Sequence, residues 1–192
     1  MPMLYIIAGP NGAGKTTAAY SLLPEVFETV EFVNADEIAR GISPLNPEGV
    51  AFHAGRIMLE RINDLTNRRI SFAFETTLSG LSYLKLIDSA KSIGYSIVLF
   101  FVYLSDFELA QRRVMVRVSK GGHNIRPDVI ERRYYKGLRN FLLYAAAADS
   151  WYIYDNSGPE YILAAKRVNN TEEVFNFEVY NKLKNYGGKE KN

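Results

Sequence analysis

Short apolar runs alternate along the chain with longer segments that repeat apolar residues at helical spacing. The strongest run, residues 95–104, is almost entirely apolar, which is typical of a strand buried on both faces of a sheet. Residues 4–8 and 71–74 are shorter runs of the same kind. The pattern predicts strands at 4–8, 28–34, 71–74, 95–104, 151–154 and 161–168.

The segments between these runs predict helices. Residues 47–67 form a long one, with apolar side chains at Val50, Ile57, Met58, Ile62 and Leu65. A final helix is expected to open at 171–174, capped by Thr171 or a neighbouring Asn. The other predicted helices are 16–23, ended by Pro24, and 34–39, 81–92, 106–119 and 128–148.

This alternation of strands and helices predicts an α/β fold. We expect a mostly parallel sheet of about five to six strands, with helices on both faces. The length of 192 residues suits one domain, which we place at 1–186 and follow with a solvated tail at 187–192. In such a sheet the carboxyl ends of the strands meet along one edge, where ligands bind.

The first predicted strand leads into a glycine-rich stretch that fits G-x-x-x-x-G-K-[ST], the phosphate-binding P-loop. A strand, a glycine loop and a helix in this order aim backbone N–H groups at one point, which attracts phosphate. Lys15 is expected to reach the outer phosphates, and the Thr16 hydroxyl to ligate Mg²⁺. The residues assigned to the nucleotide are Gly9, Pro10, Asn11, Gly12, Ala13, Gly14, Lys15, Thr16, Thr17 and, after a later strand, Asn156.

Two acids follow other predicted strands at the same edge. Asp36 can accept a proton from a substrate hydroxyl that attacks phosphorus, or it can serve as a helix cap or first-turn acid. Glu75 can hold Mg²⁺ through water or bind substrate hydroxyls; a structural role is the simpler alternative.

Arginines gather after the strongest strand. Arg113 and Arg117 are four residues apart and share a helix face, and Gly121 and Gly122 follow as a candidate hinge. Cations over the γ-phosphate favour phosphoryl transfer, so we interpret residues 112–130 as a lid; a solvated basic face is the alternative. His123 is expected to be a loop residue without a chemical role.

Composition narrows the functional classes. The formal charge of +2 gives no strong field toward nucleic acid or membrane, and the chain has no cysteine for disulfides or thiolate catalysis. With no apolar stretch long enough to cross a bilayer and no visible signal peptide, we expect a cytoplasmic protein.

The P-loop, the acid at Asp36 and the arginines favour an ATP-dependent kinase that acts on a small molecule. The alternative is a switch or motor ATPase, but the usual sensor or signature motifs of such proteins are not evident.

The chain resembles the zeta-toxin family of P-loop kinases, in particular its small stand-alone bacterial members. The resemblance runs from about residue 4 to about residue 166. It rests on GPNGAGKTT, FVNADEIA, AGRIMLERI, FETTLSG, RVMVRVSKGGHNI and DSWYIYDNS. It implies a P-loop kinase core, ATP and Mg²⁺ as cofactors, and transfer of the γ-phosphate to the 3′-hydroxyl of the sugar in UDP-N-acetylglucosamine.

The resemblance also implies roles for individual residues. Asp36 matches the catalytic base, Glu75 and Thr77 match the substrate-contacting E-x-T, and Lys15 and Thr16 match the nucleotide and metal residues. Arg117 matches one phosphate-clamping arginine, and the second clamp is one of Arg113, Arg126 and Arg133.

The chain departs from the family pattern in two ways. Arg126 stands before Pro127 where a proline is expected near position 126. The insertions that bind the sugar nucleotide in longer toxins have no clear counterpart. A separate antitoxin protein is a possible partner.

Overall fold

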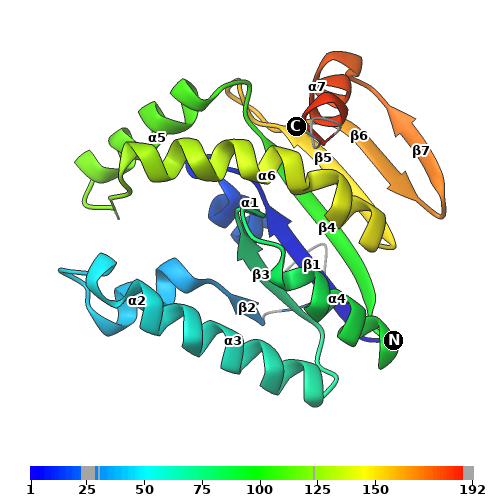
Figure 1. Cartoon of the computed structure of the whole chain (residues 1–192), viewed down its shortest axis with the longest axis horizontal. Coiled ribbons are helices and arrows are strands. Elements are labelled where there is room, and N and C mark those ends of the chain that lie inside the picture. The colour runs from blue at the N-terminus through cyan, green and yellow to red at the C-terminus, as the bar shows by residue number, and fades with distance from the viewer. Residues whose placement is uncertain (23–28, 30, 123, 188–192) are drawn as a thin grey trace, which may run out of the picture.

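A computed structural model describes residues 1–22, 29, 31–122 and 124–187, and within them the chain forms one seven-stranded sheet (Figure 1). The strand order is β2-β3-β1-β4-β5-β6-β7. Strands β1 to β5 pair in parallel, whereas β6 and β7 are antiparallel additions at one edge. The strands are β1 Met3–Ala8, β2 Phe32–Val33, β3 Phe72–Thr76, β4 Ser96–Tyr103, β5 Ser150–Asp155, β6 Ile162–Val168 and β7 Thr171–Val174. The predicted mostly parallel α/β sheet is confirmed, with one strand more than expected.

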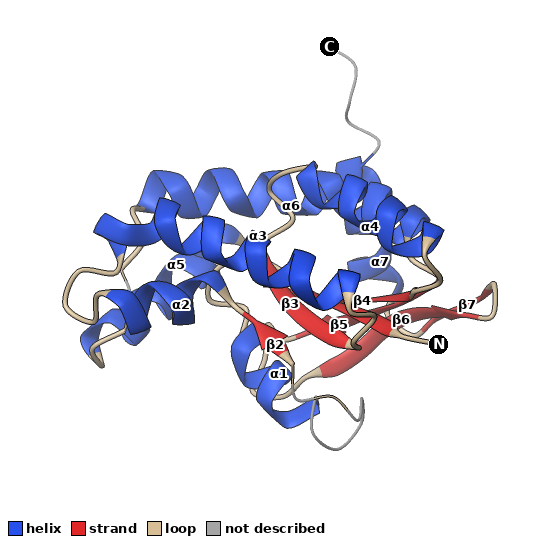
Figure 2. Cartoon of the chain, turned by 90° about the horizontal axis from the view of Figure 1, so that it is seen from below, coloured by secondary structure: helices blue, strands red, loops and turns tan. Residues whose placement is uncertain are grey.

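Helices cover the two faces of this sheet unequally. Helix α1 lies alone on one face, and the other helices lie on the opposite side (Figure 2). The helices are α1 Lys15–Leu22, α2 Ala35–Ile42, α3 Ala51–Asn67, α4 Ser82–Ser92, α5 Phe107–Ser119, α6 Pro127–Ala147 and α7 Phe177–Gly187, with a 3₁₀ turn at Glu48–Val50 before α3. None of the described helices is long and apolar enough to span a membrane.

Alternation along β1 explains how both faces are filled. Leu4 and Ile6 point into the larger core, where they meet side chains from α3, α4 and α6. Tyr5 and Ile7 point the other way, into a smaller cluster with Ala19 of α1. Since both sets are buried, the strand is apolar at every position rather than alternating.

The C-terminal segment corrects one prediction. Residues 171–174 form strand β7 instead of opening a helix. Asn169 and Asn170 both have positive φ, 50° and 61°, which is what a two-residue hairpin turn between right-twisted strands requires. Helix α7 begins at Phe177, after Asn176, whose Oδ1 accepts a hydrogen bond from Val179 N at 3.2 Å.

Four predictions touch residues outside the described part of the chain. The predicted strand 28–34 is seen as β2 only at Phe32–Val33, and Glu28 and Val30 lie outside the described residues. The same is true of Pro24, expected to end the first helix, and of His123. Helix α7 includes Gly187, and the remainder of the predicted tail, 188–192, is not described.

The parallel register brings distant polar residues to one edge of the sheet. Ile7 pairs with Glu75 and Ala8 with Thr76, so the end of β3 lies beside the start of the P-loop. On the other side of β1, the pairing of Tyr103 with Asp155 places the end of β5 next to the end of β4. The candidate site is built at this edge.

Candidate active site

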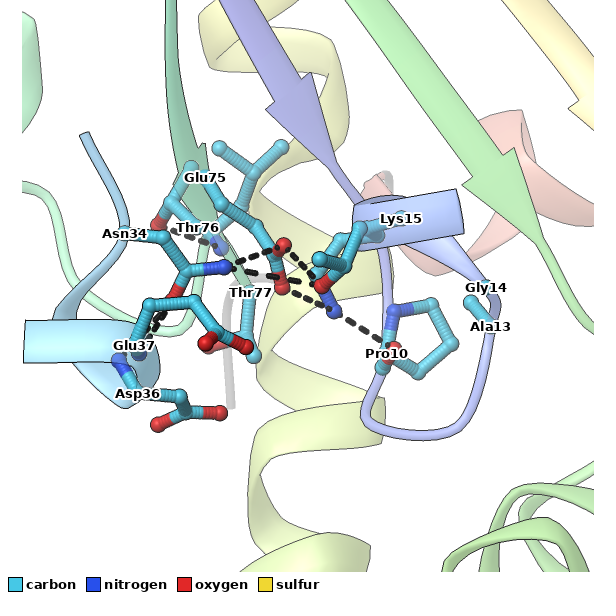
Figure 3. Close-up of polar contacts among 12 residues, drawn as sticks. Pro10, Ala13, Gly14, Lys15, Asn34, Asp36, Glu37, Glu75, Thr76 and Thr77 are labelled. Atoms are coloured by element: carbon cyan, nitrogen blue, oxygen red, sulfur yellow. Dashed lines mark hydrogen bonds and ion pairs between the residues drawn. The ribbon is translucent and has the colours of Figure 1, made fainter. Parts of the chain in front are cut away.

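The P-loop needs its glycines where the backbone passes close to neighbouring strands. Gly9 has φ 142°, and a Cβ there would lie 2.2 Å from Val102 O in β4. Lys15 is the first residue of α1 and is only 5% exposed. Its Nζ donates to Pro10 O at 2.9 Å, so the ammonium group folds back over the loop (Figure 3). This is the position from which a lysine can meet the phosphates of a nucleotide.

Glu75 joins the P-loop to the end of β3. Its Oε2 accepts a hydrogen bond from Thr16 Oγ1 at 2.6 Å, and its Oε1 lies 3.4 Å from Lys15 Nζ (Figure 3). Thr16 and Glu75 therefore present hydroxyl and carboxylate oxygens side by side. Oxygen donors of this kind suit Mg²⁺, which takes few protein ligands and completes its shell with phosphate and water. These two residues fit the metal that the sequence predicts.

Asn34 is a site residue that the sequence analysis missed. Its Oδ1 accepts from Asp36 N at 2.8 Å and from Glu37 N at 3.3 Å, which caps α2. Its Nδ2 donates to Glu75 Oε2 at 2.8 Å. The opposite amide orientation would face N–H₂ against two N–H donors, so the partners determine which end is oxygen. An Asn directly after a strand and before an acidic first turn was the available signal.

Because Asn34 caps α2, the Asp36 side chain does not serve as the cap. It lies in the first turn of α2, and its carboxylate forms no hydrogen bond or ion pair within the described part of the chain. The side chain lines a cavity of about 230 Å³ together with Glu75, Thr77 and Arg133. Of the two readings of Asp36, the structure assigns the cap to Asn34 and leaves Asp36 as a first-turn acid facing a cavity.

Arg133 brings positive charge into the same cavity from α6. Burial lowers the pKa of its guanidinium, and the negative charge of Asp36 acts in the opposite direction. An anion or a polar group with several oxygens can therefore bind between Arg133 and the P-loop. The sequence placed Arg133 among three candidate clamps, and the fold brings it next to Asp36.

The remaining walls of the cavity are partly apolar. The ring of Tyr83 packs on Phe74 with centroids 4.8 Å apart, and its hydroxyl lies 3.8 Å from the sulfur of Met58. Thr77 Oγ1 donates to Ser79 Oγ at 3.0 Å. Gly137 of α6 allows this wall to form, because a Cβ there would lie 2.4 Å from Thr77 O.

The arginines of α5 border a second, wider cleft of about 510 Å³. Arg113 and Arg117 of α5 line it, and Arg40 of α2 lines it as well. Arg113 Nη2 donates to Gly158 O at 3.2 Å. Arg126 is 74% exposed and makes two 3.0 Å hydrogen bonds to Asp128. The candidate clamp residues thus lie in three places. Arg113 and Arg117 line the wider cleft, Arg126 is exposed and paired with Asp128, and Arg133 lines the cavity of Asp36.

Asn156, directly after β5, contacts the P-loop. It is buried, and its Nδ2 donates to Ala13 O at 2.9 Å. Tyr161, five residues later, was not singled out from the sequence; its hydroxyl donates to Gly14 O at 2.8 Å. No local pattern marks Tyr161, because the contact joins residues 147 positions apart.

Known proteins resemble this chain in sequence and in fold. The sequence model of the zeta toxin family matches residues 1–167. The chain belongs to the zeta toxin family. An uncharacterized protein of Haemophilus influenzae is 32% identical over 126 residues, which is 66% of this chain and 88% of that protein. The match to the family ends before β7 and α7.

Solved structures share the fold of this zeta toxin family member. A structure of the AvrRxo1-ORF1:AvrRxo1-ORF2 complex with sulphate ions has a TM-score of 0.80 at 16% identity, covering 95% of this chain and 63% of that chain. The same complex with ATP has a TM-score of 0.77. The PezAT toxin–antitoxin system of Streptococcus pneumoniae has a TM-score of 0.64 at 17% identity, covering 84% of this chain and 70% of that one. The family match and the shared fold agree with the P-loop α/β core that the sequence predicts.

Proposed function

We propose that the protein is an ATP-dependent phosphotransferase that moves the γ-phosphate to a hydroxyl of a small molecule. The first candidate acceptor is the sugar 3′-hydroxyl of UDP-N-acetylglucosamine, on the family resemblance. The observation that carries the proposal is the Asp36 carboxylate, which has no hydrogen-bonding partner in the described chain and faces a cavity also lined by Lys15 and Glu75. A base and a phosphate-binding loop on one cavity are what transfer to a hydroxyl needs.

The P-loop holds the nucleotide in this proposal. Lys15 contacts the outer phosphates and lowers the cost of charge at the γ-phosphate. Thr16 and Glu75 would hold Mg²⁺, which when bound neutralises phosphate charge and helps to align the leaving group. The ATP seen in the AvrRxo1 complex supports ATP as the donor here.

Asp36 and its neighbours act on the acceptor. The carboxylate accepts a hydrogen bond from the attacking hydroxyl and orients it. It takes the hydroxyl proton as the oxygen bonds to the γ-phosphorus, while the bond from that phosphorus to the bridging oxygen breaks and ADP leaves. Glu75 and Thr77 lie on the same cavity and contact other hydroxyls of the acceptor. The apolar wall at Tyr83 packs against a sugar ring.

Cations stabilise the charge that develops during transfer. Arg117 approaches the γ-phosphate from α5. Of the three candidates for a second clamp, we favour Arg133, because it shares the cavity of Asp36 and Lys15, whereas Arg126 is mostly exposed and paired with Asp128.

A separate antitoxin protein is also part of the proposal. The AvrRxo1 structures contain ORF1 and ORF2 together, and PezAT is a toxin–antitoxin system. A cytoplasmic location is proposed because ATP and sugar nucleotides are supplied there.

The test is phosphorus NMR of the products after incubation with Mg-ATP and a panel of sugar nucleotides. A new phosphomonoester resonance on one acceptor, absent with Lys15→Ala, is the expected result. ATP consumption that rises with a macromolecular partner and never with an acceptor would instead identify a switch or motor ATPase.

A further inference from the structure

The loop between β5 and β6 contacts the rear of the P-loop at two consecutive carbonyls. Asn156 Nδ2 donates to Ala13 O at 2.9 Å, and Tyr161 Oη donates to Gly14 O at 2.8 Å. Gly14 O also accepts the first backbone bond of α1, from Ala18 N at 2.9 Å. Both carbonyls therefore point away from the phosphate side of the loop and are held there by side chains.

The direction of a carbonyl determines the direction of the next N–H. A trans peptide is planar, so its C=O and N–H point in opposite directions, and no cis peptide occurs among the described residues. A bond that holds Ala13 O outward turns the N–H of Gly14 inward. The bond to Gly14 O does the same for the N–H of Lys15. Inward N–H groups of this kind form the concave site that binds phosphate.

Gly14 is tightly enclosed by the same two side chains. Its φ is 86°, and a Cβ would lie 2.3 Å from Tyr161 Oη and 3.0 Å from Asn156 Nδ2. The two side chains therefore pack against the α-carbon of Gly14 as well as bonding the carbonyls. The loop between β5 and β6 therefore packs closely against the P-loop at Gly14.

The supporting loop is itself anchored. Ser105 N, just after β4, donates to Ser157 Oγ at 2.8 Å, and Ser157 N donates to Asp155 Oδ1 at 2.9 Å. Arg113 of α5 reaches Gly158 O at 3.2 Å. An anchored loop can hold the P-loop carbonyls in place before a ligand arrives, which reduces the ordering that binding requires.

We propose that Tyr161, together with Asn156, is a positioning residue that orients the Gly14 and Lys15 N–H groups toward the phosphates of the nucleotide. This inference rests on the proposed function, because it assumes that the P-loop binds ATP. Tyr161 acts through the loop and makes no contact with the phosphates. Burial raises the pKa of its hydroxyl, so the group remains a donor across the physiological pH range.

The test compares two ligands in the whole chain. Tyr161→Phe removes only the hydroxyl, and calorimetry measures its affinity for Mg-ATP and for inorganic tripolyphosphate, which has no nucleobase. Loss of one hydrogen bond predicts about three- to tenfold weaker binding of both ligands by a similar factor. Tyr95→Phe is the matched control, since its hydroxyl also donates to backbone carbonyls, Leu65 O at 3.1 Å and Ile70 O at 2.8 Å, at the opposite edge of the sheet.

Three results would overturn the positioning role. Unchanged affinity for both ligands would show that the hydroxyl is dispensable. Weaker binding of Mg-ATP with unchanged binding of tripolyphosphate would show that Tyr161 contacts the nucleobase instead. An equal loss in Tyr95→Phe shows a general loss of stability. If Tyr161→Phe melts early, Asn156→Asp serves, because it sets an acceptor against Ala13 O and should weaken both ligands more strongly. A wild-type chain that binds ATP without transferring phosphate refutes the proposed function and leaves this binding test intact.

Discussion

At the start of α2, two polar side chains that are separated by one residue are arranged differently. Asn34 accepts the first N–H groups of the helix and donates to Glu75. Asp36 is left without a bonding partner in the described chain, at the end of a helix where the dipole favours negative charge. A cap supplied by another residue is what allows an acid in this position to take part in chemistry.

Asp36→Asn tests the carboxylate of Asp36 alone, because it replaces one carboxylate oxygen by an amide nitrogen and leaves Asn34 unchanged. The variant keeps the size of the side chain and the cap at Asn34, but it cannot accept a proton. We expect a melting temperature and ATP affinity near those of the wild type, with phosphotransfer slowed by about two to four orders of magnitude. Initial rates of acceptor phosphorylation, measured beside a thermal melt of the same preparation, check this.

Glu37→Gln is the matched control, because Glu37 occupies the same first turn and pairs at 3.3 Å with the exposed Arg40. It should retain nearly full activity. An Asp36→Asn enzyme as active as this control would remove Asp36 from the mechanism and leave Glu75 as the candidate base.

At the scale of one element, α5 presents arginines in different settings. Arg117 lines the wider cleft together with Arg113 and Arg40, whereas Arg112 on the same helix is exposed. A cation that acts in the transition state should affect turnover more than nucleotide binding.

Arg117→Ala is therefore expected to lower kcat by about 10²- to 10³-fold, by analogy with a lost oxyanion donor, with a smaller change in the KM for ATP. Steady-state kinetics of Arg117→Ala and Arg112→Ala give the comparison. Equal, small effects of the two substitutions would make α5 a solvated basic face.

Helix α6 provides a second prediction at this scale, through the close approach of Gly137 to Thr77. Alanine favours a helix over glycine by about 1 kcal/mol, but the added Cβ would meet Thr77 O at 2.4 Å. Overpacking costs about 1–3 kcal/mol, so Gly137→Ala should lower the free energy of unfolding and raise the KM for the acceptor by displacing Thr77.

Gly55→Ala is the control for helix propensity, since a Cβ there meets nothing within 4 Å in α3. It should stabilise the protein by up to about 1 kcal/mol. Urea denaturation of both variants tests the pair. A stabilised Gly137→Ala would mean that α6 can move away from Thr77 without cost.

At the scale of the whole molecule, ligand binding and stability are linked. A ligand at one hundred times its Kd stabilises the folded state by about 2.7 kcal/mol. For a chain of 192 residues this corresponds to a rise in Tm of roughly 5–10 °C.

Mg-ATP should therefore raise the Tm of the wild type, and Lys15→Ala should lose most of this rise because the charge at the phosphates is gone. Glu75 keeps hydrogen bonds from Thr16 and Asn34 in that variant, so the apo protein should remain folded. Thermal melts across an ATP titration measure both. An undiminished rise in Lys15→Ala would contradict the assignment of this lysine to the phosphates.

The local pattern of residues was sufficient to predict most elements. The apolar runs predicted β1, β3 and β4 close to their observed bounds, because a strand buried on both faces must be apolar throughout. The partly buried strands β5 and β6 were also predicted close to their bounds. The prediction was wrong at Thr171–Val174, where helical capping residues precede an acidic pair. There the Asn169-Asn170 turn and pairing with β6 outweighed local preference.

By itself, the sequence determined the α/β class, the P-loop and the acids at the strand ends, because these depend on spacing within one short segment. Only the tertiary structure decided which residues meet across segments. The cap at Asn34 and its bond to Glu75, the entry of Arg133 into the cavity of Asp36, and the bond from Tyr161 to Gly14 are such contacts. These contacts depend on strand order, register and helix packing, which bring residues from distant segments together. The residues next to a side chain in the sequence do not indicate which distant residue it will contact.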